Sequence, residues 1–230
     1  MNYAYRFPAV RGIQSNREYY ISMVPMKLLS KLFPIDEENV LPEYRAQRRI
    51  NESRIPEIRD YILNNRDTYV FSALSASIDG EFKYTSSEVS DDIGILEVNM
   101  ESIFLINDGQ HRKAAIEAAI IEDPSIGNET ISIVFFKDEG LLKSQQMFTD
   151  LNKHAVKTSN SLSTLYDSRD ALAVATKKVI ENVVFLKKYT DKERDILGKN
   201  SSNLFTLNSI YKSNQRIIHS NECTDSDTQF

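Results

Sequence analysis

The chain has 230 residues, enough for one large domain or two small ones with a well-buried core. Its net charge of −5 excludes a uniformly basic nucleic-acid-binding surface, although a local basic face is compatible with it. Because Cys223 is the only cysteine, an internal disulfide and a thiolate zinc cluster are excluded, and with three histidines no metal site is predicted.

The first residues give no sign of a targeting segment. Residues 1–14 mix aromatic side chains with arginines and lack the apolar stretch of a signal peptide. The apolar runs at 103–106 and 131–136 are too short to cross a bilayer. We therefore expect a cytoplasmic protein that does not contact the membrane.

Residues 19–64 predict one strand and two helices. β-Branched and aromatic residues at 19–24 predict a strand that ends at Pro25, and apolar positions within 26–33 predict a short helix. The next helix begins near Pro56, because proline is tolerated only in a first turn, and it ends near Asn64.

The following segment is strand-like. Residues 69–78 predict a strand, and Asp79-Gly80 predicts a tight hairpin turn with 81–84 as the returning strand. Further strands are predicted at 93–98, 102–106 and 131–136, and helices at 110–122 and 141–151.

The last third of the sequence reads as helical. A long helix is predicted from Asn160 or Ser161 to about Asn182, and helical pieces are predicted at 183–189, 191–197 and 204–218. The fold class is therefore α+β: a mixed sheet with helices in residues 1–140, followed by a helical region in 141–230. Because the chain stops soon after the last predicted helix, we expect a shortened form of a longer protein.

The turn Asp108-Gly109-Gln110-His111-Arg112 is the segment most typical of a binding site. It joins a buried apolar strand directly to a helix, and the free amides of a helix's first turn bind anions. His111, Arg112 and Lys113 oppose the helix dipole there, and a bound phosphate would reverse the sign of that cost. The alternative is that the turn is only structural, with Arg112 exposed to solvent or paired with a carboxylate.

Two groups of basic residues are candidates for contact with the DNA backbone. Arg45, Arg48, Arg49 and Arg54 lie at the entry to the helix near Pro56, although Glu43, Glu52 and Glu57 could neutralise them. Lys177 and Lys178 begin a series of lysines in the C-terminal region, which could equally be a solvated helix face.

Asp108-Gly109-Gln110-His111-Arg112, followed by Ala114-Ala115, resembles the signature of the DGQHR-domain family. That family is similar to the ParB/sulfiredoxin-like superfold, in which a glycine–x–x–arginine turn before a helix contacts nucleotide phosphates. Gly109 and Arg112 match that spacing. Together with segments 3–10, 19–25, 44–61 and 146–155, this turn makes nearly the whole chain similar to the DndB family of DNA sulfur modification proteins.

The resemblance implies a DNA-binding transcriptional regulator of a DNA phosphorothioate modification operon. The implied partners are promoter double-stranded DNA, other phosphorothioation proteins and further copies of the chain. It also implies a site for ATP or CTP with Mg²⁺ at residues 108–112, and gives Asn152 as a weaker polar candidate. The alternatives are a nucleotide hydrolase of ATPase or CTPase type, a DNA-nicking enzyme, or a protein that only binds the modification machinery. No nucleophile–base pair or phosphate-binding glycine loop is evident, so the catalytic residues of an enzyme are unknown apart from Asp108.

Overall fold

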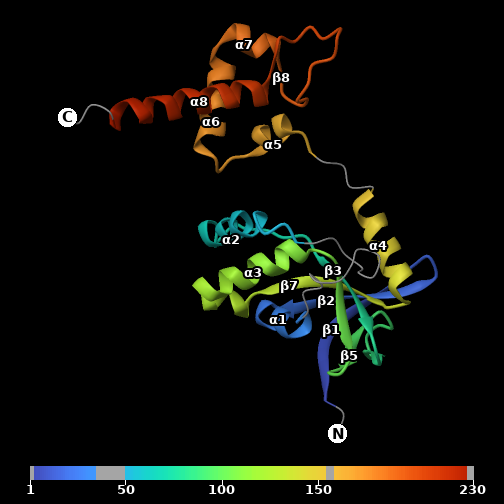
Figure 1. The fold of residues 1–230 in the computed structure, drawn as a ribbon. Coiled ribbons are helices and arrows are strands. Elements are labelled where there is room, and N and C mark those ends of the chain that lie inside the picture. Colours follow the sequence, from blue (N-terminus) through green and yellow to red (C-terminus); the bar gives the residue numbers. More distant parts are fainter. Residues whose placement is uncertain (1–2, 35–49, 154–157, 227–230) are drawn as a thin grey trace. The chain divides into compact units, whose positions relative to one another are not determined.

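The computed structural model describes residues 3–34, 50–153 and 158–226, with side chains as far as Ile218. The chain divides into two compact units, Met1–Ala155 and Val156–Phe230 (Figure 1). The first unit contains the sheet and its helices as far as α4 (Leu141–Lys153), and the second contains the remaining helices. This arrangement confirms the predicted class of a mixed sheet with helices in the C-terminal region.

One sheet dominates the first unit. Its described strands lie in the order β4-β5-β1-β2-β7-β3-β6, and only the neighbours β3 and β7 are parallel. The strands are β1 (Ala4–Gln14), β2 (Arg17–Pro25), β3 (Leu74–Asp79), β4 (Phe82–Ser86), β5 (Ile93–Asn99), β6 (Ile103–Asp108) and β7 (Thr130–Lys137). The strands predicted at 19–24, 93–98 and 131–136 are therefore confirmed.

The β1–β2 hairpin turns through Ser15 and Asn16, which both have positive φ, of 51° and 60°. Positive φ at both central residues is the geometry of a type I′ turn, whose twist matches that of the flanking strands. The long β1 strand that this hairpin requires was not assigned from the sequence.

The hairpin predicted at Asp79-Gly80 is wrong. β3 pairs with β6 and β7, whereas β4 pairs with β5, so the strands on the two sides of Gly80 do not pair with each other. Instead, β3 leads into β4 and β5 leads into β6. The β3–β6 pair and the β4–β5 pair therefore meet at a bend that contains Gly80. Gly80 has a φ of +138° there, and a Cβ would lie 2.4 Å from Ser102 Oγ, so only glycine fits the bend.

The bend curls the sheet around the core. Phe135 of β7 lies 5.8 Å, between ring centroids, from both Phe7 of β1 and Phe104 of β6. Tyr5 of β1 also meets Phe104 edge-on at 6.1 Å, although β1 and β6 are far apart in the strand order. Strands that are not neighbours in the sheet thus share one interior.

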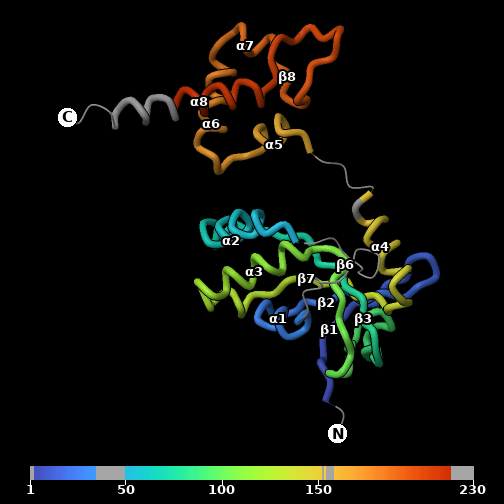
Figure 2. The backbone as a smooth tube through the Cα atoms, viewed as in Figure 1, coloured from blue at the N-terminus to red at the C-terminus, as the bar shows by residue number. Residues whose placement is uncertain are grey.

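Helices cover part of the sheet. η1 (Met26–Leu28) and α1 (Leu29–Leu32) follow β2, α2 (Arg54–Asn64) precedes β3, and α3 (Gln110–Glu122) and η4 (Pro124–Asn128) lie between β6 and β7. α2 and α3 lie side by side (Figure 2), and Ile62 of α2 and Ile116 of α3 are fully buried. α3 has the bounds predicted from the sequence.

α4 packs on the opposite face of the sheet from the core. Asn107 of β6 is buried, and its Nδ2 donates to Ser77 Oγ at 2.7 Å and to Met147 Sδ of α4 at 3.2 Å. Asn107 Oδ1 is buried and accepts no hydrogen bond from the described residues, so the two bonds donated by Nδ2 are the polar contacts that hold this side chain. These contacts fix α4 over β3 and β6.

The second unit is mainly helical: α5 (Asn160–Tyr166), α6 (Ala171–Asn182), α7 (Val184–Tyr189) and α8 (Leu207–Ser226), with the short strands β8 (Thr190–Asp191) and β9 (Phe205–Thr206). The single helix predicted over 160–182 is wrong, because Asp170 caps a new helix by accepting from Leu172 N at 2.8 Å. The helix predicted at 191–197 is also wrong. There Asp191 accepts from the amides of Glu193 and Arg194, both at 2.9 Å, and so forms a local turn.

Within the part of the chain that the structure describes, no helix is long and apolar enough to span a membrane. Among the same residues, no group of three or more histidine, cysteine or acidic side chains is placed to hold a metal ion.

Candidate functional site

Gly109 allows α3 to start immediately after β6. Its φ is +105°, and a Cβ at this position would lie 2.3 Å from Cδ2 of Leu74, which is fully buried. Only glycine adopts this backbone without strain while the neighbouring core stays in place. Glycine is therefore required in this turn for two reasons: the backbone conformation and the close packing against Leu74.

The start of α3 has no side-chain cap. The N-cap residue is Gly109, which has no side chain to accept from the first amides of the helix, and the first helical hydrogen bond runs from Lys113 N to Gly109 O at 2.9 Å. The amides of Gln110, His111 and Arg112 precede that bond, so the helix supplies no carbonyl for them. Together with the positive end of the helix dipole, they favour an anion at this position.

Arg112 is held inside the first unit. Its Nη1 donates to the carbonyl oxygens of Ser72 and Ala73, at 2.7 and 2.9 Å, and to the Ser72 hydroxyl. Its Nη2 lies 2.5 Å from Asp108 Oδ2, and only 16% of the Arg112 side chain is exposed. Arg112 thus ties the first turn of α3 to the segment that enters β3, as the structural alternative for this turn anticipated.

Lys113 is also paired within the helix, 3.0 Å from Glu117 Oε2. Arg112 and Lys113, the two cations that oppose the helix dipole, therefore each form an ion pair with a carboxylate four residues away. Asp108, the catalytic candidate, is the more exposed partner of its pair, with 43% of its side chain accessible.

The beginnings of α2 and α3 meet. The backbone amide of Asn51 donates to His111 Nε2 at 2.9 Å, so this ring nitrogen is unprotonated and accepts. The N-cap of α2, Ser53, makes no side-chain capping bond, and Arg54 is the first residue of that helix. We call the two helix N-termini, from Asn51 to Arg54 and from Gly109 to Arg112, the paired helix starts.

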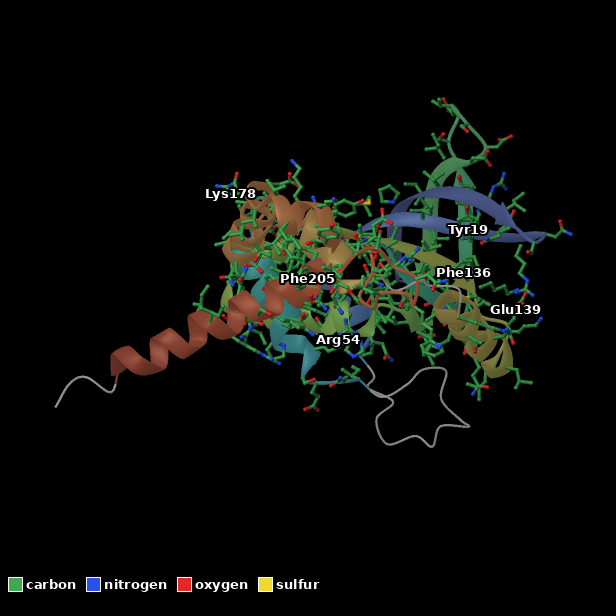
Figure 3. All side chains as sticks on the ribbon, turned by 90° about the horizontal axis from the view of Figure 1, so that it is seen from above. Tyr19, Arg54, Phe136, Glu139, Lys178 and Phe205 are labelled. Carbon is green, nitrogen blue, oxygen red and sulfur yellow. The ribbon has the colours of Figure 1, made fainter. Side chains whose placement is uncertain are left out.

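Arg54 is the exposed cation of the paired helix starts, and Figure 3 labels it on α2. Within the described residues it makes no ion pair at 4.0 Å or less. Arg59 on the same helix differs, because it pairs with Asp60 at 2.7 Å and with Glu122 at 3.1 Å. The other predicted arginines of this group, Arg45, Arg48 and Arg49, lie outside the described residues.

The segment between α2 and β3 is fixed at both ends. Arg112 holds Ser72 and Ala73, while Arg66 contacts Glu129 at 2.7 Å and Asp123 at 3.1 Å. Tyr69 donates a short hydrogen bond to Glu129, and burial, followed by this bond, raises the pKa of Tyr69 to about 12. No local pattern predicts this network, because its partners are about 60 residues apart in the sequence.

The predicted lysines of the second unit are partly engaged. Lys177 Nζ donates to the backbone carbonyls of Leu165, at 3.0 Å, and Asp167. Lys178 is exposed (labelled in Figure 3). Farther along, Lys192 and Lys187 lie 2.5 and 2.9 Å from Glu181, and their hydrogen bonds lower the pKa of Glu181 to about 2. Lys178 is therefore exposed whereas Lys177, Lys187 and Lys192 have local partners, and its contact with DNA stays a prediction.

The backbone of Asn152 lies in α4, but its side chain is outside the described part of the structure, so its predicted role stays a prediction.

The described residues define an α+β protein in which a glycine turn leads from an edge strand into a helix whose N-cap residue makes no side-chain cap. The family model for DndB, described as DNA-sulfur modification-associated, matches residues 7–230. The chain belongs to the DndB family, and this membership gives it a role in the DNA sulfur modification system. Comparisons with curated proteins and with solved structures find no match. The likeness to the DGQHR and ParB/sulfiredoxin-like groups stays a prediction.

Proposed function

We propose that this chain is a DNA-binding transcriptional regulator of a DNA phosphorothioate modification operon, and that the paired helix starts hold a phosphate group. The observation that carries the proposal is the meeting of two helix N-termini without side-chain caps, joined by the bond from Asn51 to His111. The positive ends of two helix dipoles meet there. The backbone donors for a phosphate come from α3, because the amides of Ser53, Arg54 and Ile55 at the start of α2 are bonded to Asn51 and Glu52.

Each residue of the turn has a part in this proposal. The amide of Gln110 contacts the phosphate, His111 holds the start of α2 through its bond to Asn51, and Gly109 lets the phosphate approach the backbone. Asp108 and Arg112 hold the turn in shape through their mutual ion pair and the bonds to Ser72 and Ala73. Arg54, the exposed cation beside them, supplies a charged contact to the DNA backbone.

The DNA role is tested by fluorescence-anisotropy titration of a labelled promoter duplex over a range of salt concentrations. Arg54→Ala should weaken binding to all duplexes and reduce the slope of log K against log salt by about one. Arg59→Ala is the matched control, since it removes a cation from the same helix that is already paired with Asp60 and Glu122. Equal effects of the two variants, or no binding of wild type at low salt, would contradict the proposal.

The phosphate site is tested by Gln110→Glu. A carboxylate in the first turn of α3 interacts favourably with the helix dipole, so the free energy of unfolding should rise by about 0.3–1 kcal/mol. The same negative charge repels a bound anion. We expect higher thermal stability together with loss of binding of ATP or CTP with Mg²⁺, measured by calorimetry. Gln110→Ala is the control without the added charge. Unchanged nucleotide affinity in Gln110→Glu would place the nucleotide elsewhere on the chain, and no binding to wild type would exclude a nucleotide ligand.

The enzymatic alternative depends on Asp108, whose half-exposed carboxylate lies at the start of α3, directly before the N-cap residue Gly109. A nucleotide hydrolase or a DNA-nicking enzyme needs a group that places Mg²⁺ or water close to a phosphate held by backbone donors. Asp108→Asn keeps an acceptor for Arg112 but removes the charge. Phosphate release or plasmid nicking that requires Mg²⁺ and disappears in Asp108→Asn would favour the enzyme over the regulator.

Self-association is the remaining part of the proposal. Val10, Ile21, Met23, Ile93 and Ile95 lie on one face of the neighbouring strands β5, β1 and β2, and each is 40–52% exposed. A standard interface buries about 800 Å² on each partner, for which this patch, with a polar rim around it, would supply the apolar centre. Sedimentation should show concentration-dependent dimers that Ile21→Glu dissociates, and a monomer at every concentration would contradict self-association through this face.

A further inference from the structure

A cleft of about 1170 Å³ runs along β4, away from the paired helix starts. Gly80, Glu81, Phe82, Lys83 and Tyr84 all line it. Side chains alternate between the two faces of a strand, so a run of consecutive residues can line one cleft only if the cleft follows the edge of the strand. The edge of β4 that faces away from β5 is the one that is free, because within the described residues β4 pairs with β5 alone.

The register shows which backbone groups face this edge. Asn99 N donates to Glu81 O at 3.0 Å, and Ser87 N donates to Ile93 O at 2.7 Å. In an antiparallel pair, hydrogen-bonded residues alternate with residues whose backbone groups point the other way. Lys83 and Thr85 therefore bond to β5, whereas the N–H and C=O groups of Phe82 and Tyr84 point toward the cleft.

Aromatic side chains line the inner part of the cleft. The ring of Tyr20 lies 5.8 Å from that of Phe82 and 5.3 Å from that of Tyr84. Phe136 and Glu139, both labelled in Figure 3, line the cleft from the end of β7 and the segment after it. An added strand would therefore find backbone donors and acceptors on β4 and apolar surface for one of its faces.

The charges in the cleft are largely matched. Arg6 pairs with Glu97 at 2.6 Å, Arg11 with Glu18 at 3.4 Å, and Arg17 with Glu139 at 3.3 Å. The remaining charged residues of the cleft are the two cations Lys83 and Lys137 and the anion Glu81, and none of them forms an ion pair among the described residues. So few unmatched cations do not suit a nucleic-acid backbone, but they suit single acidic side chains on a peptide.

We propose that the cleft binds an extended segment of a partner protein, which adds to the sheet as a strand beside β4. Main-chain hydrogen bonds to Phe82 and Tyr84 supply affinity, and the alternating side chains of the segment supply specificity. Its apolar side chains cover Phe82 and Tyr84 on one face of the sheet, and its acidic side chains lie beside Lys83 on the other face. This surface is independent of the paired helix starts and requires neither DNA nor nucleotide.

The test uses the full chain and a short synthetic peptide in which valine and glutamate alternate. Amide hydrogen exchange is measured with and without the peptide. The amides of Phe82 and Tyr84 should exchange rapidly in the free protein and become protected by the peptide, whereas those of Lys83 and Thr85 should be protected in both states. If Phe82 and Tyr84 are protected without peptide at every protein concentration, the edge is already occupied and the proposal is overturned. Protection that grows with protein concentration alone would assign the edge to a second copy and would also overturn it.

A second measurement does not depend on altering the fold. Only every other peptide amide faces β4, so N-methylation of the valines and N-methylation of the glutamates should differ in effect, with one series weakened about tenfold or more. On the protein, Tyr84→Pro removes the edge N–H donor and the ring, whereas Tyr84→Ala removes only the ring. The Tyr84→Pro variant should therefore bind the peptide about tenfold more weakly than the Tyr84→Ala variant. Equal affinities in both comparisons, or no binding of the unmodified peptide, would refute strand addition.

Discussion

Replacing Arg112 should destabilise the first unit rather than only remove a ligand contact. The guanidinium serves the carbonyls of Ser72 and Ala73, the Ser72 hydroxyl and the Asp108 carboxylate, and 16% of its side chain is exposed. Arg112→Ala leaves these acceptors without their donor. Losing one partner of a partly buried charged network costs about 3–5 kcal/mol, and the exposure of Asp108 places Arg112→Ala near the lower end, at about 3 kcal/mol.

Arg112→Lys separates charge from geometry. A lysine ammonium can reach one of the acceptors but cannot reproduce the planar fork, so it should recover about 1 kcal/mol of the loss. The opening free energy of the β3 amides, such as that of Ala76, is measured by native-state hydrogen exchange, which reports on the first unit separately from the second. Unchanged exchange of the β3 amides in Arg112→Ala would refute a stabilising role for the contacts of Arg112 with Ser72, Ala73 and Asp108. Arg112 would then be a candidate phosphate ligand again.

Three further predictions concern local features of the two units. Gly109→Ala should cost about 3 kcal/mol, from the positive φ and the 2.3 Å approach to Leu74, and the urea midpoint of the first unit should fall accordingly. Tyr69→Phe should cost about 1 kcal/mol in the same assay, since Glu129 keeps its contact with Arg66. For Glu181, the pKa is lowered from 4.5 to about 2, so its pairing with Lys192 and Lys187 stabilises the second unit above pH 4.5 and is lost as pH falls toward 2. Glu181→Gln should remove this pH dependence of the thermal midpoint, and an unaltered profile would show that the pairing does not contribute.

The local signals in the sequence predicted much of the first unit. The strand–glycine–helix order at residues 103–122 is set by neighbours in sequence, namely an apolar run, Gly109 and an alanine-rich stretch, and the structure confirms α3 with its predicted bounds. The same holds for β7, whose alternating pattern places Ile131, Ile133 and Phe135 in the core.

What the sequence could not supply was the choice of partners. Asp79-Gly80 signals a change in backbone direction, but pairing depends on strands that follow later in the chain, so a bend was read as a hairpin. In the site, Arg112 and Asp108 were recognised, whereas the carbonyls of Ser72 and Ala73 that hold Arg112 are backbone atoms about 40 residues away. The helix predicted at 160–182 is interrupted because Asp170 caps a new helix inside it, and that prediction included no cap between Ser161 and Asn182.

The place of β7 in the sheet has a consequence for synthesis of the chain. Within the described seven-stranded sheet, β7 is the last strand in sequence, yet it lies between β2 and β3 and joins the two halves of that sheet. During translation, the β1–β2 hairpin and the pair formed by β3 and β6 can each form early. The edges of β2 and β3 that pair with β7 stay open until Lys137 has left the ribosome. Such edges are prone to pairing with other chains, and completion of a sheet by a late central strand is slow because the loops it closes are long. A nascent chain halted before Thr130 should therefore be a target for chaperones that shield exposed strands.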